Sequence, residues 1–112
     1  PVFELSALEG YAAAIAREAP ETRIIAMAMP LLSEEAAERI EERLGVRLPD
    51  ALRELLATGD DALAWHAFRA TLEQLVAAPF VAGVAIMTFE GDAPPETGER
   101  ILAALRSAGA ID

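Results

Sequence analysis

The stretch that most constrains the fold is an apolar run followed directly by an amphipathic helix pattern, within residues 22–45. Residues 24–29, IIAMAM, lack the polar–apolar alternation of a strand with one solvated face. After the run, Ser33 is a suitable N-cap and Gly45 suits the residue that ends a helix with positive φ. We therefore predict a strand buried on both faces and then a helix over residues 34–44, which is one βα unit of a parallel sheet.

A second apolar run, VAGVAIMT at residues 81–88, is rich in β-branched side chains and predicts another strand buried on both faces. Between the two runs the spacing predicts a short helix over 50–58 and a long one over 62–77. A further helix should follow the second strand, with Asp92 as its N-cap. The inward positions expected in the last two helices are Trp65, Phe68, Leu72, Leu75, Val76, Ile101, Leu102 and Leu105.

The first nineteen residues predict the end of a strand, residues 1–4, followed by a helix. Ser6 and Glu9 have the spacing of a capping box at the start of that helix. Its expected packing face consists of Leu8, Tyr11, Ala12, Ile15, Ala16 and Ala19. The whole order predicts an α/β fold with parallel strands. Two or three strands this apolar need cover on both faces and neighbours on both edges, so we expect an incomplete sheet.

Composition limits the domain count and the class of partner. A chain of 112 residues forms a single α/β unit over 1–112. Its net charge of −10 disfavours nucleic-acid and membrane-surface binding. No apolar run reaches the roughly 18 residues of a membrane span, and no signal segment leads the chain. We therefore expect a cytoplasmic protein.

The residues alone identify no catalytic group. The chain has no Cys and one His, His66, which rules out a thiolate metal site and a His-based metal cluster or triad. Glu90 and Asp92 follow a predicted parallel strand, where α/β ligand sites lie, but helix capping and solvation explain them more simply. Gly91 precedes a helix without the glycine-rich frame of a phosphate loop. We assign no catalytic residue and no metal site.

Four segments, taken in order, resemble the C-terminal part of the methylenetetrahydrofolate reductase family, the FAD-dependent (β/α)8 barrels. Pro1-Val2-Phe3 resembles the end of the sixth barrel strand, and residues 24–31, IIAMAMPL, resemble the seventh strand. Residues 45–49, GVRLP, resemble a signature after the seventh helix. Asp60-Asp61, the long helix and residues 81–87 resemble the last crossover and the eighth strand.

This resemblance implies the C-terminal portion of a TIM barrel in an oxidoreductase of one-carbon metabolism. The family reduces methylenetetrahydrofolate to methyltetrahydrofolate with electrons from NAD(P)H through FAD. Its catalytic acid and most FAD contacts lie in earlier βα units, so this chain would supply the substrate-side wall. The positions corresponding to folate contacts are Ala36, Ile40, Met87 and Phe89. The family has a Gln and an aromatic residue where this chain has Ala36 and Ile40.

A function of another class is also compatible with the sequence. The chain could be a non-catalytic acidic α/β module that completes its sheet by self-association or by pairing with a partner. Both hypotheses require additional structure around the sheet, either the rest of a barrel or a homo-oligomer.

Overall fold

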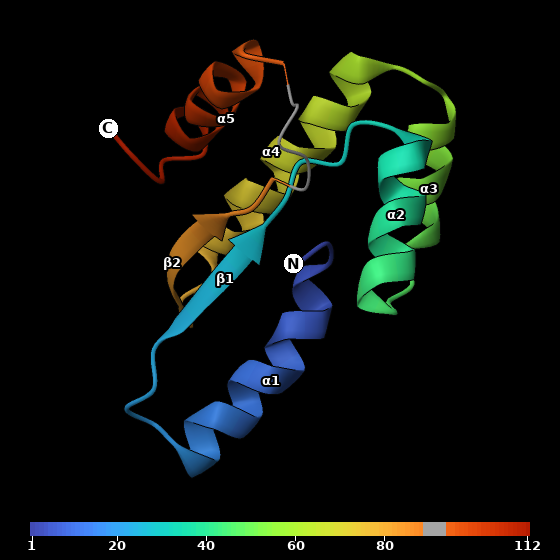
Figure 1. Cartoon of the computed structure of the whole chain (residues 1–112). Helices are drawn as coiled ribbons and strands as arrows, with labels where there is room; N and C mark the ends of the chain where they lie inside the picture. Colours follow the sequence, from blue (N-terminus) through green and yellow to red (C-terminus); the bar gives the residue numbers. More distant parts are fainter. Residues whose placement is uncertain (89–93) are drawn as a thin grey trace.

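The structure, a computed structural model, describes residues 1–88 and 94–112 (Figure 1). Its elements follow the predicted order and form a small α/β domain with a two-stranded parallel sheet. They are α1 (Leu5–Glu18), β1 (Ile24–Ala28), α2 (Glu34–Leu44), α3 (Asp50–Ala57), α4 (Asp61–Ala77), β2 (Val81–Ile86) and α5 (Glu96–Ser107). The predicted α/β class with parallel strands is therefore confirmed.

β1 lies between β2 and the N-terminal segment. In the parallel register Ile25 lies opposite Gly83 and Ala28 lies opposite Ile86. The ladder continues past β2, because the Met87 N–H donates to the Ala28 carbonyl at 3.0 Å. Successive carbonyls point to opposite edges of a strand, so the Val2 N–H, which donates to the Met27 carbonyl at 2.6 Å, lies on the other edge. Residues 1–4 form no regular strand, so the predicted strand end is wrong, but this bond places Val2 beside β1.

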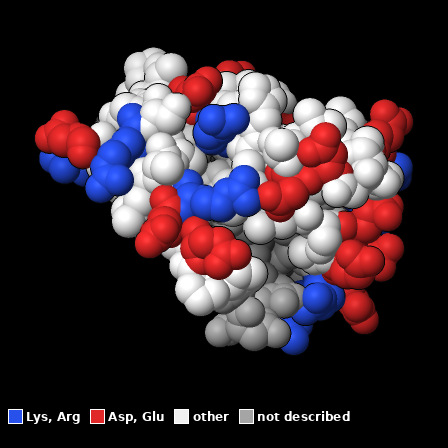
Figure 2. Space-filling view, turned by 90° about the horizontal axis from the view of Figure 1, so that it is seen from above, with Lys and Arg blue, Asp and Glu red and all other residues white. Residues whose placement is uncertain are grey.

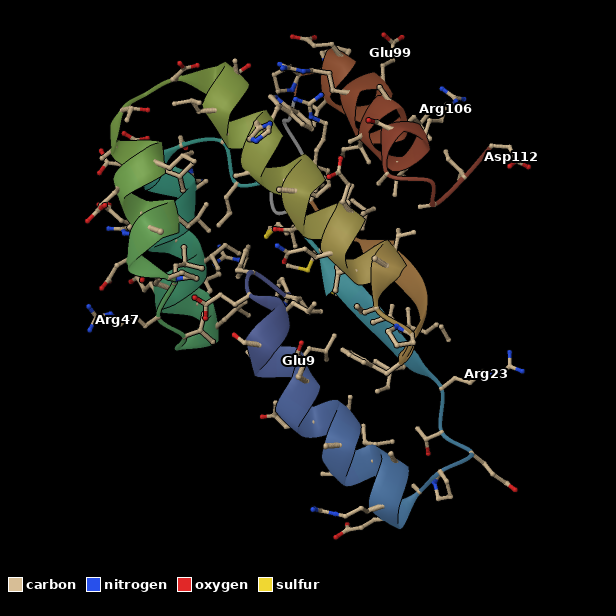
Figure 3. All side chains as sticks on the ribbon, turned by 180° about the vertical axis from the view of Figure 1, so that it is seen from behind. Glu9, Arg23, Arg47, Glu99, Arg106 and Asp112 are labelled. Atoms are coloured by element: carbon tan, nitrogen blue, oxygen red, sulfur yellow. The ribbon has the colours of Figure 1, made fainter. Side chains whose placement is uncertain are left out.

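One face of the sheet is covered by helices. Ala26 and Ala28 of β1 are buried there, and Val84 and Ile86 of β2 pack on the same cluster. In Figure 3, which views the molecule from behind, α4 crosses in front of the strands. The helical side chains of this cluster are Trp65, Phe68, Leu72 and Leu75 of α4 and Ile101 and Ala104 of α5, with Leu5 and Leu8 of α1 at its margin.

No helix or strand of residues 1–88 and 94–112 covers the opposite face of the sheet (Figure 1). Ile25 is 59% exposed and Met27 is 40% exposed, whereas Ala26 and Ala28 between and beside them are buried. The prediction of a strand buried on both faces is therefore wrong for β1 in the chain by itself. The reason is that α1, α4 and α5 contribute side chains to the cluster on one face of the sheet only.

Side chains cap the starts of α2 and α4 as the sequence predicts. The Ser33 hydroxyl accepts a hydrogen bond from the Ala36 N–H at 3.1 Å, and Gly45 ends α2 with φ of 64°. Asp60 caps α4 by accepting from the N–H groups of Ala62 and Leu63. The capping box predicted for α1 is wrong. Because α1 already begins at Leu5, which packs on the core, Ser6 lies inside the first turn and makes no cap.

The apolar stripes of the helices are narrower than the sequence spacing predicts. Tyr11 of α1, Val76 of α4 and Leu102 of α5 are exposed, although each was expected to face inward. Ala16 and Ala19 are exposed as well. A helix that packs on a single neighbouring layer buries only a narrow stripe, so residues at the stripe's edge remain in solvent.

A second core cluster joins α2 and α3 to the end of β1. Its buried members are Met29, Leu31, Ala37, Ile40, Leu48, Leu56 and Ala64. Arg53 of α3 pairs with Glu41 of α2 at 3.3 Å, and the Glu41 carboxylate accepts from the Leu48 N–H at 3.0 Å. These contacts fix the two helices at the carboxyl end of the sheet. Within residues 1–88 and 94–112, none of the helices has the length and apolar character needed to span a membrane.

Candidate ligand site at the carboxyl ends of the strands

A cavity of about 170 Å³ lies where β1 and β2 end. Open α/β sheets bind ligands outside the carboxyl ends of their strands, so this is the expected position for a site. The cavity lies between the start of α2 and the start of α5. Its lining residues are Met29, Pro30, Leu31, Leu32, Ser33, Ala36, Arg39, Thr88, Pro94 and Thr97.

The polar groups of this cavity come from the residues that follow each strand. Thr88 comes soon after β2, and Arg39 comes from the second turn of α2. Thr97 in the first turn of α5 is buried although it is polar, and its N–H donates to the Pro94 carbonyl at 2.9 Å. The sequence analysis did not select Arg39, Thr88 or Thr97. Two of them could have been found from their positions in the sequence. Thr88 is a hydroxyl residue at the end of an apolar run, and Thr97 is one near the start of a helix.

The four positions suggested by the family resemblance have different surroundings. Ala36 lines the cavity and is partly exposed. Ile40 is completely buried at 0% exposure in the second core cluster, so its side chain offers no surface to a ligand here. Met87 is partly buried and packs on the same cluster. Phe89 lies outside the described residues, as do Glu90, Gly91 and Asp92.

A larger and more apolar hollow, about 300 Å³, lies between the N-terminal segment, α3 and α4. Phe3 and Leu52 are among its walls, and Met29 and Leu31 separate it from the cavity at the strand ends. The Thr71 hydroxyl on its α4 side donates to the Ala67 carbonyl and is therefore already satisfied. With few polar groups to orient a ligand, this hollow is a weaker candidate than the strand-end cavity.

The described residues provide no metal centre. No three His, Asp or Glu side chains within residues 1–88 and 94–112 are grouped closely enough to hold an ion. His66 is exposed on α4.

The strand-end cavity does not fit FAD by itself. Its volume of about 170 Å³ is well below the roughly 300–1,000 Å³ of typical ligand and cofactor pockets. Among the described residues its walls contain no glycine-rich turn of the kind that cradles a pyrophosphate. The arrangement of apolar walls with two threonines and one arginine can orient part of a ligand. Comparison of the chain with protein-family models, with curated proteins and with solved structures found no match.

Proposed function

We propose that this chain forms the last βα units of a (β/α)8 barrel in a cytoplasmic flavoprotein similar to methylenetetrahydrofolate reductase. In that role it contributes the end of the sixth strand, the seventh and eighth strands and their helices. Its strand-end residues, including Ala36 and Met87, form part of the wall on the substrate side. The resemblance assigns the catalytic acid and most flavin contacts to other units of the barrel, and the strand-end cavity does not fit FAD by itself.

The observation that carries this proposal is the one-sided cover of the sheet. In a barrel of this type the helices form an outer ring and the other face of each strand points into a core filled by layers of side chains. Here the helical cover lies on one face, and Ile25 and Met27 project from the other. Completing the burial of these two side chains would add roughly 1.5–3 kcal/mol to the stability of the assembly, at the usual free energies of transfer from water to an apolar environment. Their exposure indicates a surface that another part of the assembly covers.

The order of strands supports the same proposal. Val2, β1 and β2 lie side by side in space in the same order as in the chain, and consecutive strands of a barrel are arranged in this way. Large and small residues alternate across the open face, since Ile25 lies opposite Gly83 and Met27 opposite Ala85. Small barrels often combine large and small inward residues in this way to fill a tapering interior.

A test at the cavity uses Ala36 in the complete natural protein. Ala36→Leu would fill part of the strand-end cavity, so we expect a several-fold rise in KM for methylenetetrahydrofolate with little change in the melting temperature. Ala13→Leu, on an exposed position of α1, is the matched control and should leave KM unchanged. A complete protein that purifies without flavin absorbance, or that does not reduce the folate with NAD(P)H, would contradict the enzyme proposal.

The open face also favours a second candidate, a non-catalytic module that covers its sheet with another copy or a partner. β2 has β1 on one edge and no further strand on its other edge among the described residues. Size-exclusion chromatography with light scattering separates the two candidates. A dimer of the chain without flavin or folate binding supports the module, whereas flavin bound to the complete protein supports the barrel.

A further inference from the structure

A cleft of about 240 Å³ lies between α4 and α5, apart from the strand-end cavity. It is lined by hydrogen-bond donors: Trp65 and Arg69 from α4, and Arg100 and Ser107 from α5, with alanines between them. Both helices begin at the end of the molecule seen in Figure 2, where basic side chains gather around a hollow. Acidic side chains lie next to these basic ones in the same view, and the chain has 19 acidic and nine basic residues.

Arg100 is held in place by two contacts. Its Nη1 donates to the Asp61 carboxylate at 2.7 Å, and its guanidinium lies 4.5 Å from the centre of the Trp65 ring. A guanidinium carries five N–H donors in a planar fork. Its contact with Asp61 is made through one nitrogen. The other N–H donors are therefore held in place but make no hydrogen bond among the described residues.

Arg69 makes no hydrogen bond or ion pair in the part of the chain that the structure describes. Glu73 lies one turn further along α4, at a spacing that permits pairing, but the two do not pair. Repulsion between Arg69 and Arg100 would be relieved by an anion between them. The cleft therefore presents two guanidinium groups, one of which is paired with the carboxylate of Asp61 beside the cleft.

Trp65 contributes a further donor without an acceptor. The residue is 5% exposed, and its indole N–H is buried with no hydrogen-bond partner among the described residues. Burying an unsatisfied donor is unfavourable, and native proteins rarely leave one. The accessible donors of the walls are the guanidinium groups of Arg69 and Arg100 and the Ser107 hydroxyl, a set that matches an oxyanion, while the indole N–H of Trp65 is buried.

We propose that the cleft between α4 and α5 binds the phosphoryl group of a small molecule. The fork of an arginine matches the oxygens of a phosphate, and Arg69 supplies a positive charge that no carboxylate of the described residues neutralises, whereas Arg100 shares its charge with Asp61. The cleft lies between helices and not at the strand ends, so this proposal does not depend on the barrel or on folate.

The chain provides its own reporter, because Trp65 is its only tryptophan. Inorganic phosphate is titrated into the chain at constant ionic strength, with sodium chloride as the balancing salt, while tryptophan fluorescence is recorded. We expect a saturable change for the natural chain. Arg69→Gln should weaken phosphate binding by about tenfold, as expected for the loss of one charge-assisted contact. This variant should fold normally, since Arg69 makes no contact that the fold requires, and circular dichroism checks this.

Arg23→Gln is the matched control. It removes the same charge from an exposed arginine between α1 and β1, which points away from the molecule in Figure 3. We expect its phosphate affinity to equal that of the natural chain. The proposal is overturned if phosphate gives no saturable change, if Arg23→Gln weakens binding as much as Arg69→Gln, or if acetate binds as tightly as phosphate.

Discussion

The two faces of the β1–β2 sheet carry similarly apolar residues but have opposite surroundings. On one face Ala26 and Ala28 are sealed by α4 and α5. On the other, Ile25 and Met27 are exposed although they are larger and more hydrophobic. The larger side chains of β1 therefore point away from the cover that the chain supplies. A barrel or an oligomer, as proposed above, would account for this distribution, because the residues with most to gain from burial would then face the part that covers them.

The largest effect is expected on the covered face. Leu72 of α4 is 0% exposed and belongs to the cluster that packs on the sheet. Leu72→Ala should lower the free energy of unfolding by about 2–5 kcal/mol through lost burial and a residual cavity. Urea denaturation of the chain measures this. Val76→Ala, on the same helix but 38% exposed, is the control and should cost well under half as much. Equal losses would show that α4 does not cover the sheet as described.

A smaller effect is expected at the start of the covering helix. Asp60 accepts hydrogen bonds from Ala62 and Leu63, so Asp60→Ala should cost about 1 kcal/mol of unfolding free energy. Asp60→Asn keeps an oxygen acceptor and should cost only a few tenths. The same urea denaturation measures both variants. If the alanine variant melts like the natural chain, the cap does not stabilise α4.

The smallest effect is expected on the open face. A Cβ at Gly83 would lie 3.1 Å from Cδ1 of Ile25, the far end of a flexible side chain that is 59% exposed. Ile25 can therefore move aside. Gly83→Ala should leave the stability of the isolated chain unchanged or raise it by up to about 1 kcal/mol, because alanine lowers the conformational entropy of the unfolded chain. Thermal melting measures the change. A loss larger than 1 kcal/mol would show that Ile25 cannot move, and hence that this face is already covered in the isolated chain.

The sequence predicts the elements because their ends have local causes. Ser33, Gly45 and Asp60 fix helix ends through hydrogen bonds or backbone conformation within a few residues. The same local reasoning failed at Ser6, where packing of Leu5 on the core begins the helix earlier. It also failed for Tyr11, Val76 and Leu102, because the width of a buried stripe depends on how many neighbouring layers touch the helix.

The candidate site was less predictable than the fold. Ala36 lines the cavity at the strand ends, but Ile40, one turn later, is buried in the core. Which of two residues on a helix faces a cavity depends on how that helix is placed in the fold. The spacing of residues in the sequence does not give this placement. The cleft formed by Arg69 and Arg100 was missed for a similar reason, since α4 and α5 meet only in the folded chain.

Thiol labelling tests most directly whether the open face of the sheet is covered in the complete protein. The method suits this chain because it contains no cysteine. Met27→Cys places a thiol on the open face, and Val76→Cys places one on the outside of α4, at positions that are 40% and 38% exposed. In the isolated chain at low concentration both thiols should react with an alkylating reagent at similar rates. In the complete natural protein we predict that the Met27→Cys variant is protected while the Val76→Cys variant still reacts. Equal reactivity of both variants in the complete protein would contradict the account.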